Sequence, residues 1–142
     1  MSQENVEIVR QFSERSARMD WDGVADLVDP NVVQHGTAGG MDEGRVLRGL
    51  SEIRQDYESV EKTWDEHQIE PQEFIDAGDR VVVFLREYQR GKRSGIELTI
   101  DTAVVVDLLD GRIVRIQGFM DRAAALKAVG LSERDGHGGV RP

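Results

Sequence analysis

Residues 108–131, LLDGRIVRIQGFMDRAAALKAVGL, decide the fold of this chain. The Asp-Gly pair at 110–111 is typical of a tight β-hairpin turn, whose backbone needs positive φ angles that these two residues tolerate. The run at 112–120 therefore predicts the last strand of an antiparallel pair. Asp121 suits the N-cap of a closing helix, and Gly130 suits its C′ position. We expect a strand hairpin followed directly by a helix.

The chain ahead of this stretch begins with helical patterns. Apolar residues recur on one side of residues 4–19, for which Ser2 is the expected N-cap, and a short second helix precedes Asp29-Pro30. The run NVVQH at 31–35 predicts a short strand, and a long glycine-rich connection follows it. Residues 50–64 space their apolar side chains by three and four, which predicts the clearest amphipathic helix of the chain.

Most of the second half predicts strands. Residues 67–77 suit an edge strand, because Pro71 has no N–H to donate to a neighbouring strand. Residues 80–90 and 96–109 predict two long strands, joined by a hairpin at 91–95. Helices followed by an antiparallel meander predict an α+β fold.

The strand at 96–109 predicts how the two faces of the sheet are used, because alternate side chains point to opposite faces. The face expected to meet the helices holds Leu98, Ile100, Val104, Val106 and Leu108. The other face is semi-polar and is expected to meet solvent or a partner subunit; it holds Glu97, Thr99, Asp101, Ala103, Val105 and Asp107.

Length and composition indicate a soluble globular protein. The chain has 142 residues, which suits one domain over 1–131 with a disordered tail over 132–142. Its 18 Lys and Arg face 27 Asp and Glu, and the net charge of −9 disfavours nucleic acid and anionic membranes as partners. Cysteine is absent, and no apolar run approaches the roughly 20 residues that cross a bilayer. We expect a cytoplasmic protein.

Four stretches together resemble a known family over roughly residues 3 to 131. They are RMDWDGVADLVDPNVV at 18–33, GLSEIRQDY at 49–57, DAGDRVVVFLREYQRGKRSG at 76–95, and the stretch quoted first, which is the most specific. The chain is similar to the SnoaL-like branch of the nuclear transport factor 2-like superfamily. This resemblance implies a conical barrel, in which N-terminal helices pack on a strongly curved, mainly antiparallel sheet.

The resemblance also implies a pocket between sheet and helices, a small apolar ligand, and a homodimer that uses the outer sheet face. Val105, Ile113 and Phe119 are expected on that outer face. The aromatic and Met side chains expected around the pocket are Phe12, Tyr57, Trp64, Phe84, Tyr88 and Met120. Enzymes of the superfamily include polyketide cyclases, ketosteroid isomerases and limonene epoxide hydrolases, so the fold alone does not give the reaction.

His35 falls where the isomerases carry their catalytic carboxylate, and a histidine can move protons near neutral pH. The oxyanion donors of the isomerases fall at Phe12 and Val105, which cannot donate a hydrogen bond. Ketosteroid isomerisation is therefore not expected. His35 is expected at the mouth of the cone, sharing its side with an inward Val33, either as a base or as a rim residue.

The two other mechanisms are also matched in part. Arg86 lies near an arginine of the epoxide hydrolases, but the last acid of that family falls at Gly118. Arg86 is expected either inside the cone, paired with Asp101 or a ligand carboxylate, or at the surface. Asp121 matches the general base of the cyclases, whose partner histidine falls at Val106. An N-cap role alone would also explain Asp121.

Two hypotheses about function stay open from the sequence. The first is a cofactor-independent isomerase, cyclase, hydrolase or dehydratase acting on an apolar cyclic metabolite, with His35, Asp121 and Arg86 as candidate catalytic residues. The second is a non-catalytic ligand-binding or dimerisation domain. No cofactor is expected. His35 with Asp42 or Glu43 makes a weak ligand set for a metal.

Overall fold

A computed structural model describes residues 2–132 of the chain, and the predicted tail lies outside the described residues almost entirely. The four helices of this part are α1 (Ser2–Ala17), α2 (Trp21–Ala25), α3 (Gly49–Thr63) and α4 (Arg122–Ala128). Within residues 2–132, no helix combines the length and the apolar character that crossing a membrane requires.

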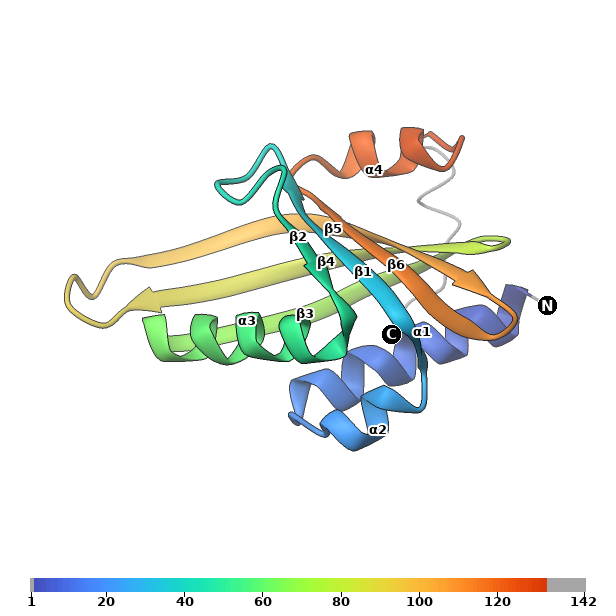
Figure 1. Cartoon of the computed structure of the whole chain (residues 1–142). Helices are drawn as coiled ribbons and strands as arrows, with labels where there is room; N and C mark the ends of the chain where they lie inside the picture. Colours follow the sequence, from blue (N-terminus) through green and yellow to red (C-terminus); the bar gives the residue numbers. More distant parts are fainter. Residues whose placement is uncertain (1, 133–142) are drawn as a thin grey trace.

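Six strands form one mixed sheet that does not close on itself (Figure 1). They are β1 (Val28–Ala38), β2 (Val46–Arg48), β3 (Trp64–Ala77), β4 (Arg80–Gly91), β5 (Glu97–Leu109) and β6 (Arg112–Phe119). Their order across the sheet is β2-β1-β6-β5-β4-β3, with β1 and β6 parallel and the other pairs antiparallel. β3 is an edge strand, as Pro71 predicts, and the α+β fold is confirmed.

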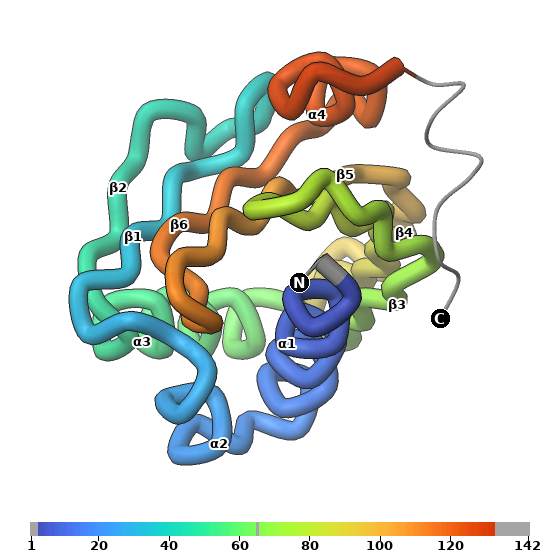
Figure 2. Tube along the Cα trace, turned by 90° about the vertical axis from the view of Figure 1, so that its right-hand side faces the viewer, coloured from blue at the N-terminus to red at the C-terminus, as the bar shows by residue number. Residues whose placement is uncertain are grey.

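The two faces of the sheet carry different helices, which lie on opposite sides of it in Figure 2. On the inner face, side chains of α1, α2 and α3, including Val9, Val24 and Ile53, pack on the sheet in the main core. On the outer face, Ala125 and Leu126 of α4 pack on a smaller core that includes Val105. The sheet therefore separates two layers of helices.

The predicted alternation along β5 is confirmed from residue 103 onward, whereas Leu98, which was expected to meet the helices, is 46% exposed. Val104 and Val106 belong to the inner core, while Ala103 and Val105 belong to the outer one. The prediction for Ile113 was wrong, because this fully buried side chain belongs to the inner core. α4 covers Val105, which is only 3% exposed. The apolar outer face expected to meet a partner subunit is thus partly occupied by the chain's own helix.

The turn and cap predictions of the C-terminal stretch are confirmed. Asp110 and Gly111 have φ angles of 51° and 77°, as a tight hairpin turn requires. Asp121 caps α4, its carboxylate accepting from the Ala123 N–H at 3.0 Å. Gly130 has φ 80°, and the Leu131 N–H donates to the Leu126 carbonyl at 2.8 Å, which closes the helix in a Schellman motif.

The region between residues 26 and 48 differs most from its prediction. α2 ends at Ala25, so Asp29-Pro30 lies inside β1, and β2 lies in the segment predicted as a connection. Carboxylates hold the β1–β2 hairpin: Asp42 accepts from the Thr37 N–H at 3.1 Å, and Glu43 accepts from the Gly39 N–H at 2.7 Å. These side-chain contacts stabilise a strand that is too short to show an apolar pattern.

Candidate functional site

A cavity of about 430 Å³ lies between the inner face of the sheet and helices α1 to α3; we call it the inner cavity. Its sheet side carries aliphatic and aromatic side chains, among them Phe74, Leu85 and Val104. Its helix side carries Phe12, Trp21 and Tyr57, with the Trp21 and Tyr57 rings meeting edge to face, their centroids 5.4 Å apart. A cavity of this size and character suits a small organic molecule.

Four uncharged polar side chains in this apolar lining make no side-chain hydrogen bond within the described part of the chain, namely Ser13, Ser16, Gln34 and Tyr57. The Ser16 Oγ atom is buried and has no partner. The Gln34 amide and the Tyr57 hydroxyl also line the cavity and form none of the side-chain hydrogen bonds of residues 2–132. Burial and then the nearby Glu61 carboxylate raise the pKa of Tyr57, which keeps its hydroxyl protonated. A ligand can contact the Gln34 and Tyr57 groups directly, whereas the buried Ser16 Oγ atom reaches the cavity only after its side chain rotates about χ1.

Two of the six predicted pocket residues line this cavity, namely Phe12 and Tyr57. Phe84 lies in the outer core, where the Arg122 guanidinium covers its ring at 4.6 Å, and Met120 is 38% exposed. Their placement in the pocket was wrong. Phe84 alternates with Leu85 along β4, so only Leu85 points inward.

The remaining two predicted pocket residues lie towards the β4–β5 hairpin. Trp64 pairs with Gly91 at that end of the sheet. The Tyr88 hydroxyl donates to Glu97 at 3.0 Å, and Tyr88 shares the outer face of β4 with Phe84. Neither side chain lines the inner cavity, so these placements were also wrong.

His35 does not point into the inner cavity, because β1 has the opposite alternation from the one expected. Val32 is fully buried in the inner core and Gln34 lines the inner cavity. His35 therefore points to the outer face, together with Val33. The expectation that His35 and Val33 share the inward side was wrong. The position that faces the cavity holds an amide, which does not exchange protons near neutral pH.

His35 instead lines a second cavity, of about 440 Å³, on the outer face; we call it the outer pocket. This pocket lies between the β1–β2 hairpin, the end of α4 and strands β4 to β6. Its charged residues are Arg80, Arg115, Asp107 and Glu43, beside the apolar Val105, Phe119, Ala38 and Ala128. Burial and then the charges of Arg115 and Arg48 lower the pKa of His35, so its ring is neutral at pH 7.

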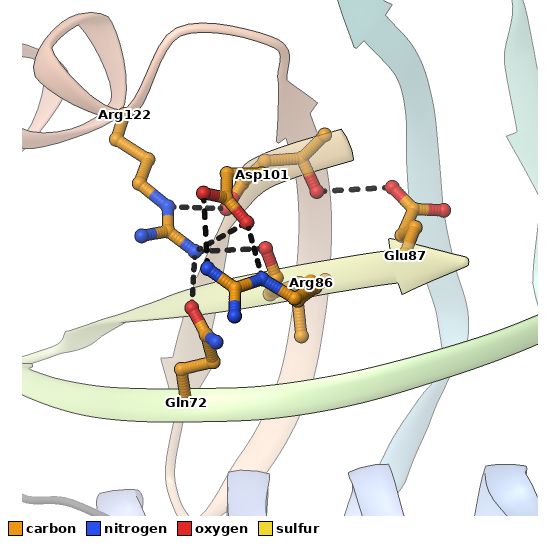
Figure 3. A network of polar contacts seen from close by, with 7 residues as sticks. Gln72, Arg86, Glu87, Asp101 and Arg122 are labelled. Atoms are coloured by element: carbon orange, nitrogen blue, oxygen red, sulfur yellow. Dashed lines mark hydrogen bonds and ion pairs between the residues drawn. The ribbon is translucent and has the colours of Figure 1, made fainter. Parts of the chain in front are cut away.

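Arg86 also lies on the outer face, and its predicted partner is confirmed. Its Nε donates to the Asp101 carboxylate at 2.9 Å (Figure 3). Arg122 reaches the same place from α4, with its Nη2 atom 3.8 Å from Asp101 and hydrogen-bonded to Gln72 at 2.8 Å. The expectation that Arg86 points into the cone was wrong, because the face it shares with Phe84 is the outer one.

Asp121 caps α4 and lines neither cavity. The structure thus does not bring His35, Asp121 and Arg86 to one cavity. Gly118 occupies the position at which the sequence comparison with the epoxide hydrolases expected an acid, and the space beside it leaves no room for a side chain. A Cβ atom at Gly118 would lie 2.7 Å from the Thr37 Oγ1 atom, so a side chain there would require Thr37 to move.

A buried histidine that the sequence analysis did not single out lies beyond one end of the inner cavity. The His67 side chain is 5% exposed, and its Nδ1 and Nε2 atoms lie 3.2 Å from Glu61 and 3.8 Å from Glu87. Thr102 donates to Glu87 at 2.9 Å. The carboxylates of Glu87 and Glu61 raise the pKa of His67 despite its burial. Alternation from Ile69 could have placed His67 on the inner face, but its carboxylate partners come from α3 and β4.

Comparison with known proteins agrees with this architecture. The sequence pattern of the SnoaL-like domain matches residues 9–116. The chain belongs to the SnoaL-like domain family. A search of curated protein sequences finds no match.

Solved structures share the fold over most of the chain. A nuclear transport factor 2-like protein of unknown function from Burkholderia pseudomallei K96243 is 25% identical, with a TM-score of 0.71 over 89% of this chain and 98% of that one. TerC, co-crystallised with polyporic acid, is 23% identical, with the same TM-score and coverages. A hypothetical protein with a ketosteroid isomerase-like fold from Catenulispora acidiphila DSM 44928, in complex with trimethylamine, is 15% identical, with a TM-score of 0.68 over 90% of this chain and 95% of that one.

Proposed function

We propose that this protein binds a neutral, largely apolar small molecule in the inner cavity and does not turn it over. The observation that carries the proposal is an apolar cavity containing polar atoms without partners, above all the buried Ser16 Oγ atom. An unsatisfied buried polar group costs about 1–3 kcal/mol, and a ligand that bonds to it recovers part of that energy. Ser16 is therefore better explained by a ligand than by the fold.

The chemistry of these polar groups indicates the chemistry of the ligand. Ser13, Ser16, Gln34 and Tyr57 each supply a donor, and none of them carries a charge. They suit carbonyl or hydroxyl oxygens on a molecule whose body meets Phe12, Trp21 and the aliphatic sheet face. A charged ligand would lose its hydration there, and the Arg10 guanidinium of the lining is already engaged by Glu7 at 3.5 Å and by the Phe74 ring.

The enzyme hypothesis is supported less well by this cavity. Its described titratable lining residues are Arg10, Glu14 and Tyr57. The Arg10 guanidinium lies over the Phe74 ring at 4.8 Å, Glu14 is exposed on α1, and Tyr57 has a raised pKa. No histidine lines this cavity among the described residues, and the raised pKa of Tyr57 makes its hydroxyl a poorer base at neutral pH. Binding without turnover therefore requires fewer assumptions.

Two solved structures of similar fold contain small organic molecules, one of them polyporic acid and the other trimethylamine. They support the general idea that this fold accommodates small ligands. They do not choose between chemical classes for this chain, since both similarities lie below 25% identity.

The test compares three molecules of one shape: 2-naphthol, naphthalene and 2-naphthoate. Calorimetry and thermal shift should show binding of 2-naphthol, weaker binding of naphthalene, and none of the charged naphthoate. Val104→Phe places a ring inside the cavity and should abolish this binding. Leu109→Phe makes a similar change at the end of the same strand, where Leu109 is 65% exposed, and should leave binding unchanged. Equal binding to both variants would contradict the proposal.

The family resemblance also implies a homodimer, which we retain as a separate proposal. Its apolar basis is smaller than expected, because α4 already buries Val105. Light scattering at micromolar concentration tests it directly: a dimer has twice the monomer mass, and a monomer mass would rule this assembly out.

A further inference from the structure

The outer pocket has properties that the inner cavity lacks, and the proposed function does not use it. The two cavities lie on opposite faces of the sheet, and β5 lines both, through Val104 on one side and Val105 on the other. The outer pocket is lined by charged as well as apolar side chains. A ligand of different chemistry would therefore be expected there.

Two arginines enter this pocket with most of their donors unused. The Arg115 Nη2 atom donates to Gln117 at 3.3 Å, and the Arg80 Nη1 atom donates to the Ala128 carbonyl at 3.0 Å. These are the only hydrogen bonds of the two guanidinium groups within residues 2–132. Each guanidinium has five N–H donors arranged in a planar fork, which suits a carboxylate.

Asp107 lies between these arginines but is not satisfied by them. Its Oδ1 atom is 3.7 Å from the Arg80 Nε atom, and its Oδ2 atom is 3.9 Å from the Arg115 Nη1 atom. Both distances are too long for a hydrogen bond, and the buried Oδ1 atom has no hydrogen-bond partner among the described residues. The pocket thus presents a free acceptor next to free cationic donors.

The charges around His35 make this side of the pocket favourable for an anion. Three positive charges lie here, on Arg48 of β2, Arg80 of β4 and Arg115 of β6. Two negative charges lie beside them, on Asp107 of β5 and on Glu43 in the hairpin loop. The Glu43 carboxylate is already engaged by the Gly39 N–H. The local charge is therefore positive, although the whole chain carries −9.

We propose that the outer pocket is a second binding site, for a small organic acid that also carries a hydroxyl group. Its carboxylate pairs with Arg115 and Arg80, and its apolar part lies against Val105 and Phe119. Its hydroxyl donates to the Asp107 carboxylate through Oδ2, because Oδ1 is buried while the side chain as a whole is 24% exposed. This inference does not rest on the function proposed for the inner cavity, because the two sites share no lining residue.

The experiment uses mandelate, which carries a phenyl ring, a carboxylate and a hydroxyl, against two molecules that each lack one group. Calorimetry should show that mandelate binds, that phenylacetate binds about three- to tenfold more weakly, and that benzyl alcohol does not bind. Asp107→Ala, which removes the acceptor, should remove the preference for mandelate over phenylacetate. Absence of mandelate binding at about 10 mM, a concentration at which even weak ligands bind, overturns the proposal.

Substitutions of arginine separate a specific site from general attraction of anions. Arg115→Gln should weaken mandelate binding by about tenfold or more, and Arg115→Lys, which keeps the charge but loses the fork, should weaken it less. Arg93→Gln removes the same charge at the β4–β5 hairpin and should leave binding unchanged. If Arg93→Gln and Arg115→Gln weaken binding equally, the pocket is not the site and the proposal is wrong.

The ring of His35 gives an independent readout by NMR, assigned with His35→Asn. A bound carboxylate would offset the arginine charges that lower the pKa of His35, so mandelate should raise that pKa in the wild-type protein. The same addition should leave it unchanged in Arg115→Gln. A His35 pKa that does not respond to mandelate in the wild-type protein contradicts binding in this pocket.

Discussion

Ser16 is a polar residue that the empty protein does not need. Its Oγ atom is buried without a partner, and it occupies a position in α1 where alanine has a higher helix propensity. We expect Ser16→Ala to raise the free energy of unfolding of the ligand-free protein by about 0.5–1 kcal/mol and to weaken 2-naphthol binding by about three- to tenfold. Urea unfolding and calorimetry measure the two effects.

Ser59→Ala is the matched control, because Ser59 is exposed on α3. It gains helix propensity without changing the cavity, so it should leave ligand affinity unchanged. If Ser16→Ala instead destabilises the empty protein by more than about 1 kcal/mol, the hydroxyl has a structural role and the argument from its missing partner fails.

His67 should make stability depend on pH. Its folded pKa is raised above the unfolded value of about 6.5, so its contribution is complete below that pH and is lost as pH rises through the folded pKa. The pKa of Glu87 is lowered, first by His67, so its contribution is lost as pH falls through the folded pKa of the carboxyl. We expect the pair to stabilise the fold most between these two transitions, in weakly acidic solution.

His67→Gln should remove the decline of stability above pH 6.5. Urea unfolding at about pH 6, below the imidazole transition, and at about pH 9, above it, gives the difference in stability between wild type and variant. Breaking a fully buried ion pair costs about 3–5 kcal/mol. At the lower pH the variant should lose less stability than that, because the Glu87 side chain is 24% exposed. A constant difference between the two proteins at both pH values would contradict the charged pair.

The case of His35 shows what one sequence cannot decide at this scale. The alternation of side chains along NVVQH was predicted correctly, but its phase was not, because Val32 and Val33 are equally apolar. The neighbouring strands fix that phase: Gln34 pairs with Leu47 and Ile116, both of which are buried in the inner core. A shift of one residue exchanges the two faces of a strand. Gln34 therefore faces the inner cavity, where His35 was expected, and His35 faces the outer pocket.

At the scale of the element, α4 is held by a cap that the sequence already predicts. Asp121→Ala should cost about 0.5–2 kcal/mol of stability, and Asp121→Asn or Asp121→Ser should restore most of it, since both side chains can accept the Ala123 N–H. Thermal or urea unfolding of the three variants provides the measurement. Equal losses with Asn and Ala would show that capping is not the main role of Asp121.

The same helix is anchored to the sheet by Arg122, which the sequence does not reveal. Its guanidinium donates to the carbonyls of Thr102 and Leu85 at 3.1 and 2.9 Å and also lies over the Phe84 ring. Arg122→Ala should cost about 2–3 kcal/mol in urea unfolding, because two backbone carbonyls lose their donor. Lys127→Ala, on the exposed side of α4, should stay within about 0.5 kcal/mol of wild type.

Elements with a strong internal pattern could be predicted, and elements defined by contacts could not. The amphipathic spacing of α3, the apolar run of β5 and the Asp110-Gly111 turn depend on neighbouring residues alone. β2 has only three residues, and its place depends on the hairpin before it, where the Thr37 and Gly39 N–H groups donate to the Asp42 and Glu43 carboxylates. The same limit explains His67, whose carboxylate partners lie 6 and 20 residues away in the sequence.

At the scale of the whole molecule, one sheet serves two cavities of different chemistry. Successive residues of β5 face opposite sides, so Val104 and Val106 line the apolar cavity while Val105 and Asp107 line the charged pocket. The alternation that forms the two cores also makes the two cavities. Neither cavity shares a lining side chain with the other, which allows each to be altered alone.

The two sites should therefore bind their ligands independently. Val104→Phe should abolish 2-naphthol binding and leave mandelate affinity within about twofold, and Arg115→Gln should do the reverse. Titrating each ligand in the presence of saturating amounts of the other should change its affinity by less than about threefold, since a larger factor requires a coupling free energy near 1 kcal/mol. Each variant thus serves as the folding control for the other. If filling the inner cavity also weakened mandelate binding tenfold, the two ligands would compete for one site or depend on one shared rearrangement of the sheet. The separation of function across its faces would then be wrong, even though both cavities exist.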